Sequence, residues 1–360
     1  MKQCVFIATS LNGSSVSDYF QALANKFDDE GYKVVIFTKK RDTIDGFNKN
    51  VEVCFYVSNR PTGFSDFKLV YDKIKIDKPI LTISSFGAVN VFILASYLAK
   101  VPNRVAWIRT LSTQFGRQSK FLVFRRTLVY RLASIITVNS NATKEDVSSF
   151  FKINKKKITV LPNSVNNYHD HGEGAIYENN KIVFVGRLDP SKGIDTLIRA
   201  VKLLVDEGIE VTLDIIGSGK QKDELQELVE KLKLNDVVIF EGNKPKAHVL
   251  KALKNAHCTV VPSRSEAFGY VVIEGMSVGT CVIGANNTGI KETIIDNETG
   301  LLFETGNHTN LAEKLKMVLL DSDFRNQLAI NGHQRFLDFY ETSKAIQRDF
   351  DFFKKIANDD

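Results

Sequence analysis

The stretch KIVFVGRLDPSKGID, residues 181–195, passes from an apolar, β-branched run through a polar turn to the start of a helix. The run ends at Gly186, Asp189 and Pro190 make the turn, and a helical pattern follows Gly193. Strands that alternate with helices in this way are typical of parallel sheets covered on both faces. This stretch therefore predicts the first unit of such a sheet.

The same alternation continues in both directions along the chain. After this stretch come the strand-like runs VTLDIIG, DVVIFEG, CTVVPS, TCVIGA and GLLF, and before it come VFIAT, KVVIFT, PILTIS, RVAWIR and SIITVN. Two such series predict an α/β protein with two doubly wound, Rossmann-like domains that face each other across a cleft. We expect the domains to cover residues 1–168 and 178–341, with a C-terminal helix at 342–360 packing back on the first.

The composition is that of an ordinary globular protein. The chain has 360 residues, 43% hydrophobic and 25% charged, which is enough for two domains with separate cores. Its four cysteines are far apart and form no CxxC pair, so a reducing cytoplasm is expected. The apolar segment at 88–99 is shorter than the ~20 residues that cross a bilayer, and the N-terminus lacks a signal-peptide cleavage site.

Charge is distributed unevenly along the chain. The formal net charge is +6, but residues 1–170 carry +12 and the remainder carries −6. No acidic residue occurs between Asp77 and Glu145, while ten basic residues do. Such a field favours an anionic partner, which could be membrane lipid, a phosphate-bearing acceptor or nucleic acid.

Two clusters of charged residues follow strands of the second half. Arg187 and Lys192 stand at the carboxyl edge of the sheet, where two cations and a helix start suit a diphosphate. In SEAFGYVVIEG, 265–275, Glu266 is expected in a loop and Glu274 on the helix that follows. Each cluster taken alone has an equally good structural explanation. Arg187 and Lys192 could be solvated loop charges, and Glu274 could be a partly buried glutamate bonded to a neighbour.

Together, the two clusters resemble the retaining nucleotide-sugar glycosyltransferases of the GT-B fold, glycosyltransferase family 4, which carry an E-x7-E motif. The resemblance is strong over residues 181–320 and weak in the N-terminal half. The residues that match the family's motif and its diphosphate-binding pair are Glu266, Phe268, Gly269 and Glu274, with Arg187 and Lys192.

The resemblance implies roles in donor binding for the E-x7-E residues. Glu274 would accept hydrogen bonds from both ribose hydroxyls of the nucleotide. Glu266, with the backbone amides of Phe268 and Gly269, would hold hydroxyls of the donor sugar. The C-terminal domain would therefore bind the nucleotide sugar, and the N-terminal domain would bind the acceptor.

The resemblance also implies which residues would act in catalysis. Arg187 and Lys192 would neutralise the diphosphate as the glycosidic bond breaks, and Glu266 would act beside them. By analogy, Gly242 and Asn243, after the strand VVIF, would contact the nucleotide base.

In the N-terminal half, the resemblance assigns two further residues. Gly13, in SLNGSS, corresponds to the family's first turn, which approaches the diphosphate. Arg109 occupies the position where many relatives place a histidine that contacts the sugar or the acceptor. We expect an acceptor contact there, and an ordinary basic surface residue is the alternative.

The segment RQSKFLVFRRTLVYRL, 117–132, places Phe121, Phe124, Leu128 and Leu132 at helical spacing among arginines. Such a stripe is most often core, with the arginines in solvent. Because acidic residues are absent on both sides, an anionic membrane surface or a phospholipid-linked acceptor is the other interpretation.

The sequence predicts no metal site and no cofactor beyond the nucleotide sugar itself as co-substrate. It contains no HExxH, Walker or GxSxG motif. The DxD-like strings at 321–323 and 349–351 fall within helical patterns rather than after a strand.

We therefore expect a retaining transferase that moves a hexose or N-acetylhexosamine from a UDP-sugar to a glycan or lipid-linked acceptor. The expected setting is cell-surface polysaccharide or lipopolysaccharide synthesis, in the cytoplasm or peripheral on the inner face of the membrane. A nucleotide-sugar epimerase or hydrolase on the same fold remains an alternative. A basic nucleic-acid-binding protein is another, although no recognition module supports a nucleic-acid partner. A dinucleotide oxidoreductase is weaker, because neither SLNGSS nor IGSGKQ completes GxGxxG.

Overall fold

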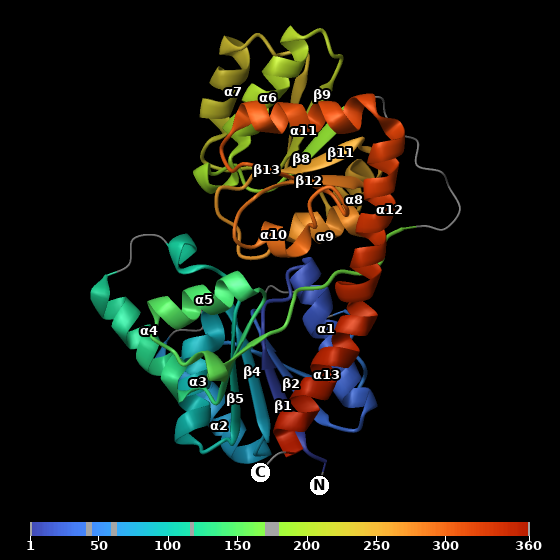
Figure 1. The fold of residues 1–360 in the computed structure, drawn as a ribbon. Coiled ribbons are helices and arrows are strands. Elements are labelled where there is room, and N and C mark those ends of the chain that lie inside the picture. The colour runs from blue at the N-terminus through green and yellow to red at the C-terminus, as the bar shows by residue number, and fades with distance from the viewer. Residues whose placement is uncertain (1, 41–44, 59–62, 116–118, 170–179, 359–360) are drawn as a thin grey trace. The chain divides into compact units, whose positions relative to one another are not determined.

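A computed structural model describes residues 2–40, 45–58, 63–115, 119–169 and 180–358 of the chain. Contacts divide the chain into two compact units. Unit 1 comprises Met1–Val165 with Thr342–Asp360, and unit 2 comprises Asn166–Glu341. Each unit is a parallel sheet with helices on both faces (Figure 1), as the alternating pattern predicts.

Unit 1 is built on a seven-stranded sheet in the order β3-β2-β1-β4-β5-β6-β7, and every pairing is parallel. Its strands are β1 Cys4–Ala8, β2 Lys33–Thr38, β3 Glu52–Phe55, β4 Leu81–Ser85, β5 Asn103–Ile108, β6 Ile135–Val138 and β7 Ile158–Val160. Its α-helices are α1 Ser15–Asp29, α2 Phe64–Asp77, α3 Val89–Leu98, α4 Lys120–Leu132, α5 Asn141–Phe150 and α13 Thr342–Asn358.

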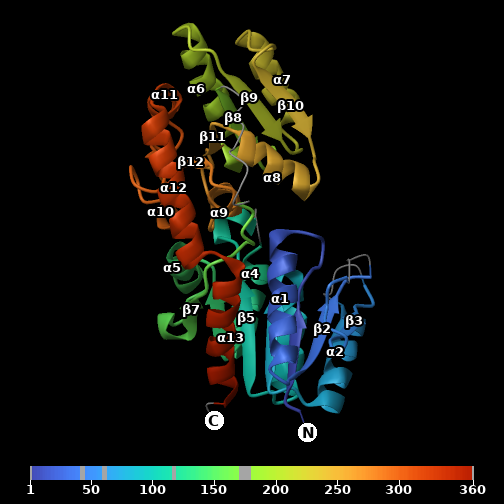
Figure 2. The same ribbon diagram turned by 90° about the vertical axis from the view of Figure 1, so that its right-hand side faces the viewer.

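The C-terminal helix α13 belongs to the core of unit 1. It lies beside α1 (Figure 2), and the ring of Phe350 packs at 5.0 Å from that of Phe27. Phe353 packs at 5.8 Å from the buried Trp107 of β5. Asp349, from one of the DxD-like strings, is fully buried and accepts a hydrogen bond of 2.6 Å from the Tyr19 hydroxyl. Asp349 therefore has a structural role in the core of unit 1.

Unit 2 contains a six-stranded parallel sheet in the order β10-β9-β8-β11-β12-β13. Its strands are β8 Lys181–Val185, β9 Thr212–Ile216, β10 Val238–Gly242, β11 Cys258–Val261, β12 Cys281–Ala285 and β13 Leu301–Phe303. Its α-helices are α6 Ile194–Asp206, α7 Lys222–Lys231, α8 Lys246–Asn255, α9 Tyr270–Ser277, α10 Ile290–Thr293, α11 His308–Leu320 and α12 Ser322–Phe339.

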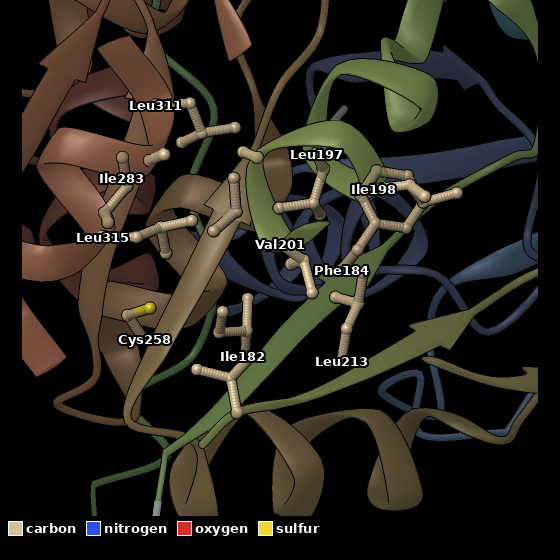
Figure 3. Packing of buried hydrophobic residues seen from close by; sticks show 14 of the residues in the cluster. Ile182, Phe184, Leu197, Ile198, Val201, Leu213, Cys258, Ile283, Leu311 and Leu315 are labelled. Atoms are coloured by element: carbon tan, nitrogen blue, oxygen red, sulfur yellow. The ribbon is translucent and has the colours of Figure 1, made fainter. Parts of the chain in front are cut away.

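The core of unit 2 lies between this sheet and the helices α6 and α11. Figure 3 shows Ile182 and Phe184 of β8 packed against Ile198 and Val201 of α6, with Leu311 of α11 nearby. Burial of this apolar surface fixes the strand ends and the loops that follow them. In the described part of the chain, no helix has both the length and the apolar character needed to cross a membrane.

The four cysteines are free thiols. Cys4, Cys258 and Cys281 are buried, and Cys54 is half-buried. Burial raises the pKa of the Cys4 and Cys281 thiols to about 12, so both remain protonated at neutral pH.

Candidate active site

The order of the strands in unit 2 creates a topological switch point at one sheet edge. β8 and β11 are parallel neighbours, but β8 leads through α6 to β9 on one side, whereas β11 leads through α9 to β12 on the other. The loops that follow these two strands therefore diverge at their carboxyl ends. Open α/β sheets bind their ligands at such a switch point. Arg187 and Lys192 lie in the first of these loops, and Glu266 lies in the second, just before the helix α9 that carries Glu274.

The structure brings Lys192 and Glu266 into direct contact. The Lys192 Nζ lies 2.6 Å from the Glu266 Oε2, and the side chains are 21% and 15% exposed. The Ser263 hydroxyl lies 3.4 Å from the same carboxylate oxygen. Because both side chains are mostly buried, the surrounding residues hold the pair in place. A ligand bound here would therefore meet a cation and a carboxylate at fixed positions.

Arg187 stands at the same sheet edge but extends into solvent. Its side chain is 81% exposed, and its guanidinium lies 3.3 Å from the Asp189 carboxylate. Asp189 also accepts a hydrogen bond from the Ser191 amide at 3.1 Å, which caps the turn before Lys192. The long, exposed Arg187 side chain is thus free to reorient toward a ligand, whereas Lys192 is fixed.

The two loops are joined by Arg264, which the sequence analysis did not single out. Its amide donates to the Ser191 carbonyl oxygen at 2.7 Å, and its guanidinium donates to the Pro190 carbonyl oxygen at 2.7 Å. The same guanidinium forms a salt bridge of 2.6 Å with Asp195 at the start of α6. Arg264 therefore sets the spacing between the Lys192 loop and the Glu266 loop.

Close backbone approach explains the glycines of this site. Gly193 has a φ of +65°, and a Cβ there would lie 2.2 Å from the Pro262 carbonyl oxygen. Gly289, after β12, donates its amide to the Glu266 carbonyl oxygen at 3.1 Å, and a Cβ there would lie 2.5 Å from that oxygen. The Glu266 loop is therefore clamped between loops from two neighbouring strands.

The E-x7-E stretch folds as the sequence predicts. α9 begins at Tyr270, immediately after Gly269, whose φ of +90° lies in the left-handed region. Phe268 is buried at 4% exposure, so its ring anchors the loop while its backbone lies at the helix start. Glu274 is half-buried one turn further along α9, and the Ser277 hydroxyl donates to its carbonyl oxygen at 2.8 Å.

The expected base-contacting residues lie two strands away from β8. Gly242 ends β10 with a φ of +72°, and its carbonyl oxygen accepts the Gly217 amide at 2.9 Å. Asn243 follows and is exposed. A Cβ on Gly217 would lie 1.9 Å from the Gly186 carbonyl oxygen, so the turn after β9 packs against the turn after β8. These turns share one sheet edge with the Lys192 loop.

Unit 1 holds the other two predicted site residues. Gly13 follows β1 with a φ of +72°, is exposed, and precedes Ser14, which caps α1. Arg109 follows β5 and is only 9% exposed, so the alternative of an ordinary surface residue is wrong. Its guanidinium donates to the Asn163 Oδ1 at 2.6 Å. No pattern in the sequence indicates that this arginine is buried.

The structure exposes most of the apolar stripe predicted in the segment 117–132, of which 117 and 118 fall outside the described residues. Phe121 and Phe124 of α4 are 69% and 60% exposed, and Leu128 is 44% exposed. The expectation that this stripe forms core is therefore wrong for these three residues. Leu132, the fourth residue of the stripe, is half-buried and packs against the same core cluster as the buried Tyr130.

In the described part of the chain, no group of three or more His, Cys, Asp or Glu residues is arranged to hold a metal ion. Asp321, from the DxD-like string at 321–323, caps α12 by accepting a hydrogen bond from the Phe324 amide at 2.9 Å.

Comparisons with known proteins agree with this geometry. Residues 16–167 match the family model described as Glycosyltransferase Family 4, and residues 169–335 match the model for Glycosyl transferases group 1. A solved structure of Anabaena HepE in complex with UDP-glucose has a TM-score of 0.80 at 18% identity, covering 99% of this chain and 100% of that one. The fold is that of a GT-B glycosyltransferase.

The two models together cover most of the chain, which belongs to glycosyltransferase family 4. An uncharacterized glycosyltransferase of Methanocaldococcus jannaschii is 34% identical over 50% of this chain and 49% of its own length. The Campylobacter jejuni N-acetylgalactosamine-N,N'-diacetylbacillosaminyl-diphospho-undecaprenol 4-alpha-N-acetylgalactosaminyltransferase is 32% identical over 58% and 56%. These alignments span about half the length of each relative.

Proposed function

We propose that the protein is a retaining glycosyltransferase that moves a hexose or N-acetylhexosamine from a UDP-sugar to a glycan or lipid-linked acceptor. The contact between Lys192 and Glu266 at the switch point of unit 2 carries this proposal. It places a cation suited to a diphosphate beside a carboxylate suited to sugar hydroxyls. The Anabaena structure, which holds UDP-glucose, and the Campylobacter relative, named for a lipid-diphosphate acceptor, support the same class of donor and acceptor.

Each site residue has a role in this reaction. Lys192 and the exposed Arg187 neutralise the negative charge that builds up on the diphosphate as the bond from the sugar C1 to the phosphate oxygen breaks. The acceptor hydroxyl forms the new bond to C1 from the face of the leaving group, and the departing phosphate takes its proton. Glu266 orients the sugar, and Glu274 holds the ribose. The products are the glycosylated acceptor and UDP.

We infer that these side chains supply the positive charge without a metal ion. Chelation with EDTA should then leave the initial rate unchanged. A rate that falls in EDTA and returns on addition of Mg²⁺ or Mn²⁺ would contradict this inference.

A panel of nucleotide sugars tested by thermal shift would identify the donor, since a ligand that binds the folded state raises its unfolding temperature. We expect UDP and one UDP-sugar to stabilise the protein and Glu274→Ala to abolish the shift. Glu227→Ala, an exposed glutamate on α7, is the control and should keep it. No shift with any nucleotide would refute the proposal. Rapid turnover of the sugar nucleotide without acceptor would point instead to a hydrolase or epimerase.

We further propose that the exposed stripe of α4, defined by Phe121, Phe124 and Leu128, rests on an anionic bilayer on the cytoplasmic face of the membrane. Apolar side chains on an exposed helix face, within a stretch that has no acidic residue from 78 to 144, suit such a surface.

Sedimentation with phosphatidylglycerol vesicles tests the α4 surface. The double variant Phe121→Ser and Phe124→Ser should bind vesicles less than the parent protein does. The control is Phe64→Ser, which removes a ring that is 79% exposed on α2. No sedimentation of the parent protein, or an equal loss in the control, would exclude this surface.

A further inference from the structure

Unit 1 contains a pocket of about 400 Å³ that lies at the carboxyl end of β5 and beside α3 and α4. A volume of this size is sufficient for a small ligand. The polar and aromatic residues that line it are Asn90, Trp107, Arg109, Arg125, Arg126 and Tyr130. Three of them are arginines, and the lining includes no carboxylate.

Arg109 is the unusual member of this lining. It is 91% buried by area, since only 9% of it is exposed, yet its Nε and one terminal nitrogen have no hydrogen-bond partner among the described residues. The other terminal nitrogen donates to the Asn163 Oδ1 at 2.6 Å. Unsatisfied donors on a buried cation are costly, so they point to a ligand.

Aromatic rings hold Arg109 in place without neutralising its charge. The guanidinium carbon lies 5.1 Å from the centre of the Trp107 ring and 5.3 Å from that of Phe20. It also lies 5.6 Å from the centre of the Tyr19 ring. No ion pair with a carboxylate joins Arg109 to any described residue. The group is thus preorganised, and because no described carboxylate forms a salt bridge with it, its donors can bind an anion.

The arginines of α4 add to this positive charge. Arg125 and Arg126 line the same pocket, and no acidic residue occurs between Asp77 and Glu145 in the sequence. Three guanidinium groups offer more N–H donors than the two oxygens of a carboxylate accept. A phosphate or diphosphate, with more oxygens and charge, is the better match.

We propose that this pocket binds a phosphate or diphosphate group carried by the acceptor. The inference rests on the proposed function, because the cations proposed for the donor diphosphate, Arg187 and Lys192, belong to unit 2. It makes the acceptor a phosphorylated compound. Both a lipid diphosphate and a sugar phosphate have this chemistry.

Calorimetric titration of the full chain with inorganic pyrophosphate in saturating UDP tests the pocket, because UDP then occupies the donor site. We expect pyrophosphate to bind, and we expect Arg125→Ala and Arg109→Lys to weaken it at least tenfold. Arg109→Lys keeps the charge but loses the planar fork of donors. Arg131→Ala, an exposed arginine of α4 outside the pocket, is the control and should bind like the parent protein.

A titration with UDP alone, carried out before the pyrophosphate titration, tests the proposed function separately from the pocket inference. If UDP does not bind, the proposed function fails. If UDP binds but pyrophosphate does not, or if Arg125→Ala binds it as tightly as Arg131→Ala does, the pocket inference is overturned. Because Arg125 is exposed, its variant gives a valid result even if Arg109→Lys unfolds. Tighter binding of farnesyl diphosphate than of pyrophosphate would indicate a lipid diphosphate, and tighter binding of glucose 1-phosphate would indicate a sugar phosphate.

Discussion

The contact between Lys192 and Glu266 predicts that neutralising the lysine weakens UDP binding, whereas neutralising the glutamate does not. The two groups are 2.6 Å apart and mostly buried, so the carboxylate partly cancels the field of the ammonium. Lys192→Ala removes the cation proposed to bind the diphosphate. Glu266→Gln removes the competing negative charge and leaves the cation in place.

The size of each effect follows from the geometry. A hydrogen bond to a charged group contributes about 1.5–3 kcal/mol, so Lys192→Ala should weaken UDP binding by roughly 10- to 150-fold. Glu266→Gln keeps the shape of the side chain and removes the repulsion of the diphosphate. UDP binding should therefore stay equal or become up to ~10-fold tighter, an effect of about 1.4 kcal/mol. Sugar transfer should nevertheless fall, because Glu266 orients the sugar.

Isothermal titration with UDP, followed by a transfer assay with the identified UDP-sugar, measures both quantities. The control is Lys316→Ala, which removes a lysine paired at 2.9 Å with Glu207 on the surface of the same unit and should leave both unchanged. Equal weakening of UDP binding by Lys192→Ala and Glu266→Gln would refute the assignment. The pair would then be holding the two loops together rather than binding the donor.

Two further predictions concern the fold around the site. Gly193→Ala should lower the unfolding temperature and weaken UDP binding, because its φ of +65° costs about 1–2 kcal/mol for alanine and its Cβ would clash with the Pro262 carbonyl oxygen. Gly208→Ala, at a φ of +78° with open space around the Cβ, should lower the unfolding temperature less and keep UDP binding; equal effects would contradict the clash. Asp349→Ala should cost about 1–3 kcal/mol in denaturant unfolding, since it leaves the buried Tyr19 hydroxyl without its hydrogen-bond partner. Asp349→Asn should cost less, because burial raises the pKa of this carboxyl by penalising its charged form, and the exposed Asp351→Ala should cost under 1 kcal/mol.

The sequence was sufficient to predict the two parallel sheets and the placement of the charge clusters in unit 2. Strand-like runs that end in a turn before a helical pattern mark the carboxyl edge of a parallel sheet, and Lys192 follows the run KIVFVG while Glu266 follows the run CTVVPS. Their direct contact could not be predicted, because it depends on the order of the strands across the sheet. Only the neighbouring position of β8 and β11 brings the two loops together.

The residues that support the site could not be predicted from the sequence. Arg264 and Gly289 act through backbone carbonyl oxygens of loops distant in sequence. Nothing in the identity of an arginine or a glycine shows which carbonyl group it will meet. Hydrophobic spacing likewise placed Phe121 and Phe124 on one face of a helix, but spacing cannot show whether another element covers that face.

Arg109 shows how the fold can place a cation where sequence alone would expect solvent. β5 ends beside the aromatic cluster of α1, and the C-terminal helix α13 covers that cluster from a position more than 200 residues away in the chain. Tyr19 contacts the Arg109 guanidinium with its ring and the Asp349 carboxylate with its hydroxyl. Loss of the buried hydrogen bond to Asp349 would therefore free the ring that holds Arg109, so a stability defect in α13 should also weaken pyrophosphate binding in unit 1. A purely structural role for α13 would leave that binding unchanged once the protein is folded.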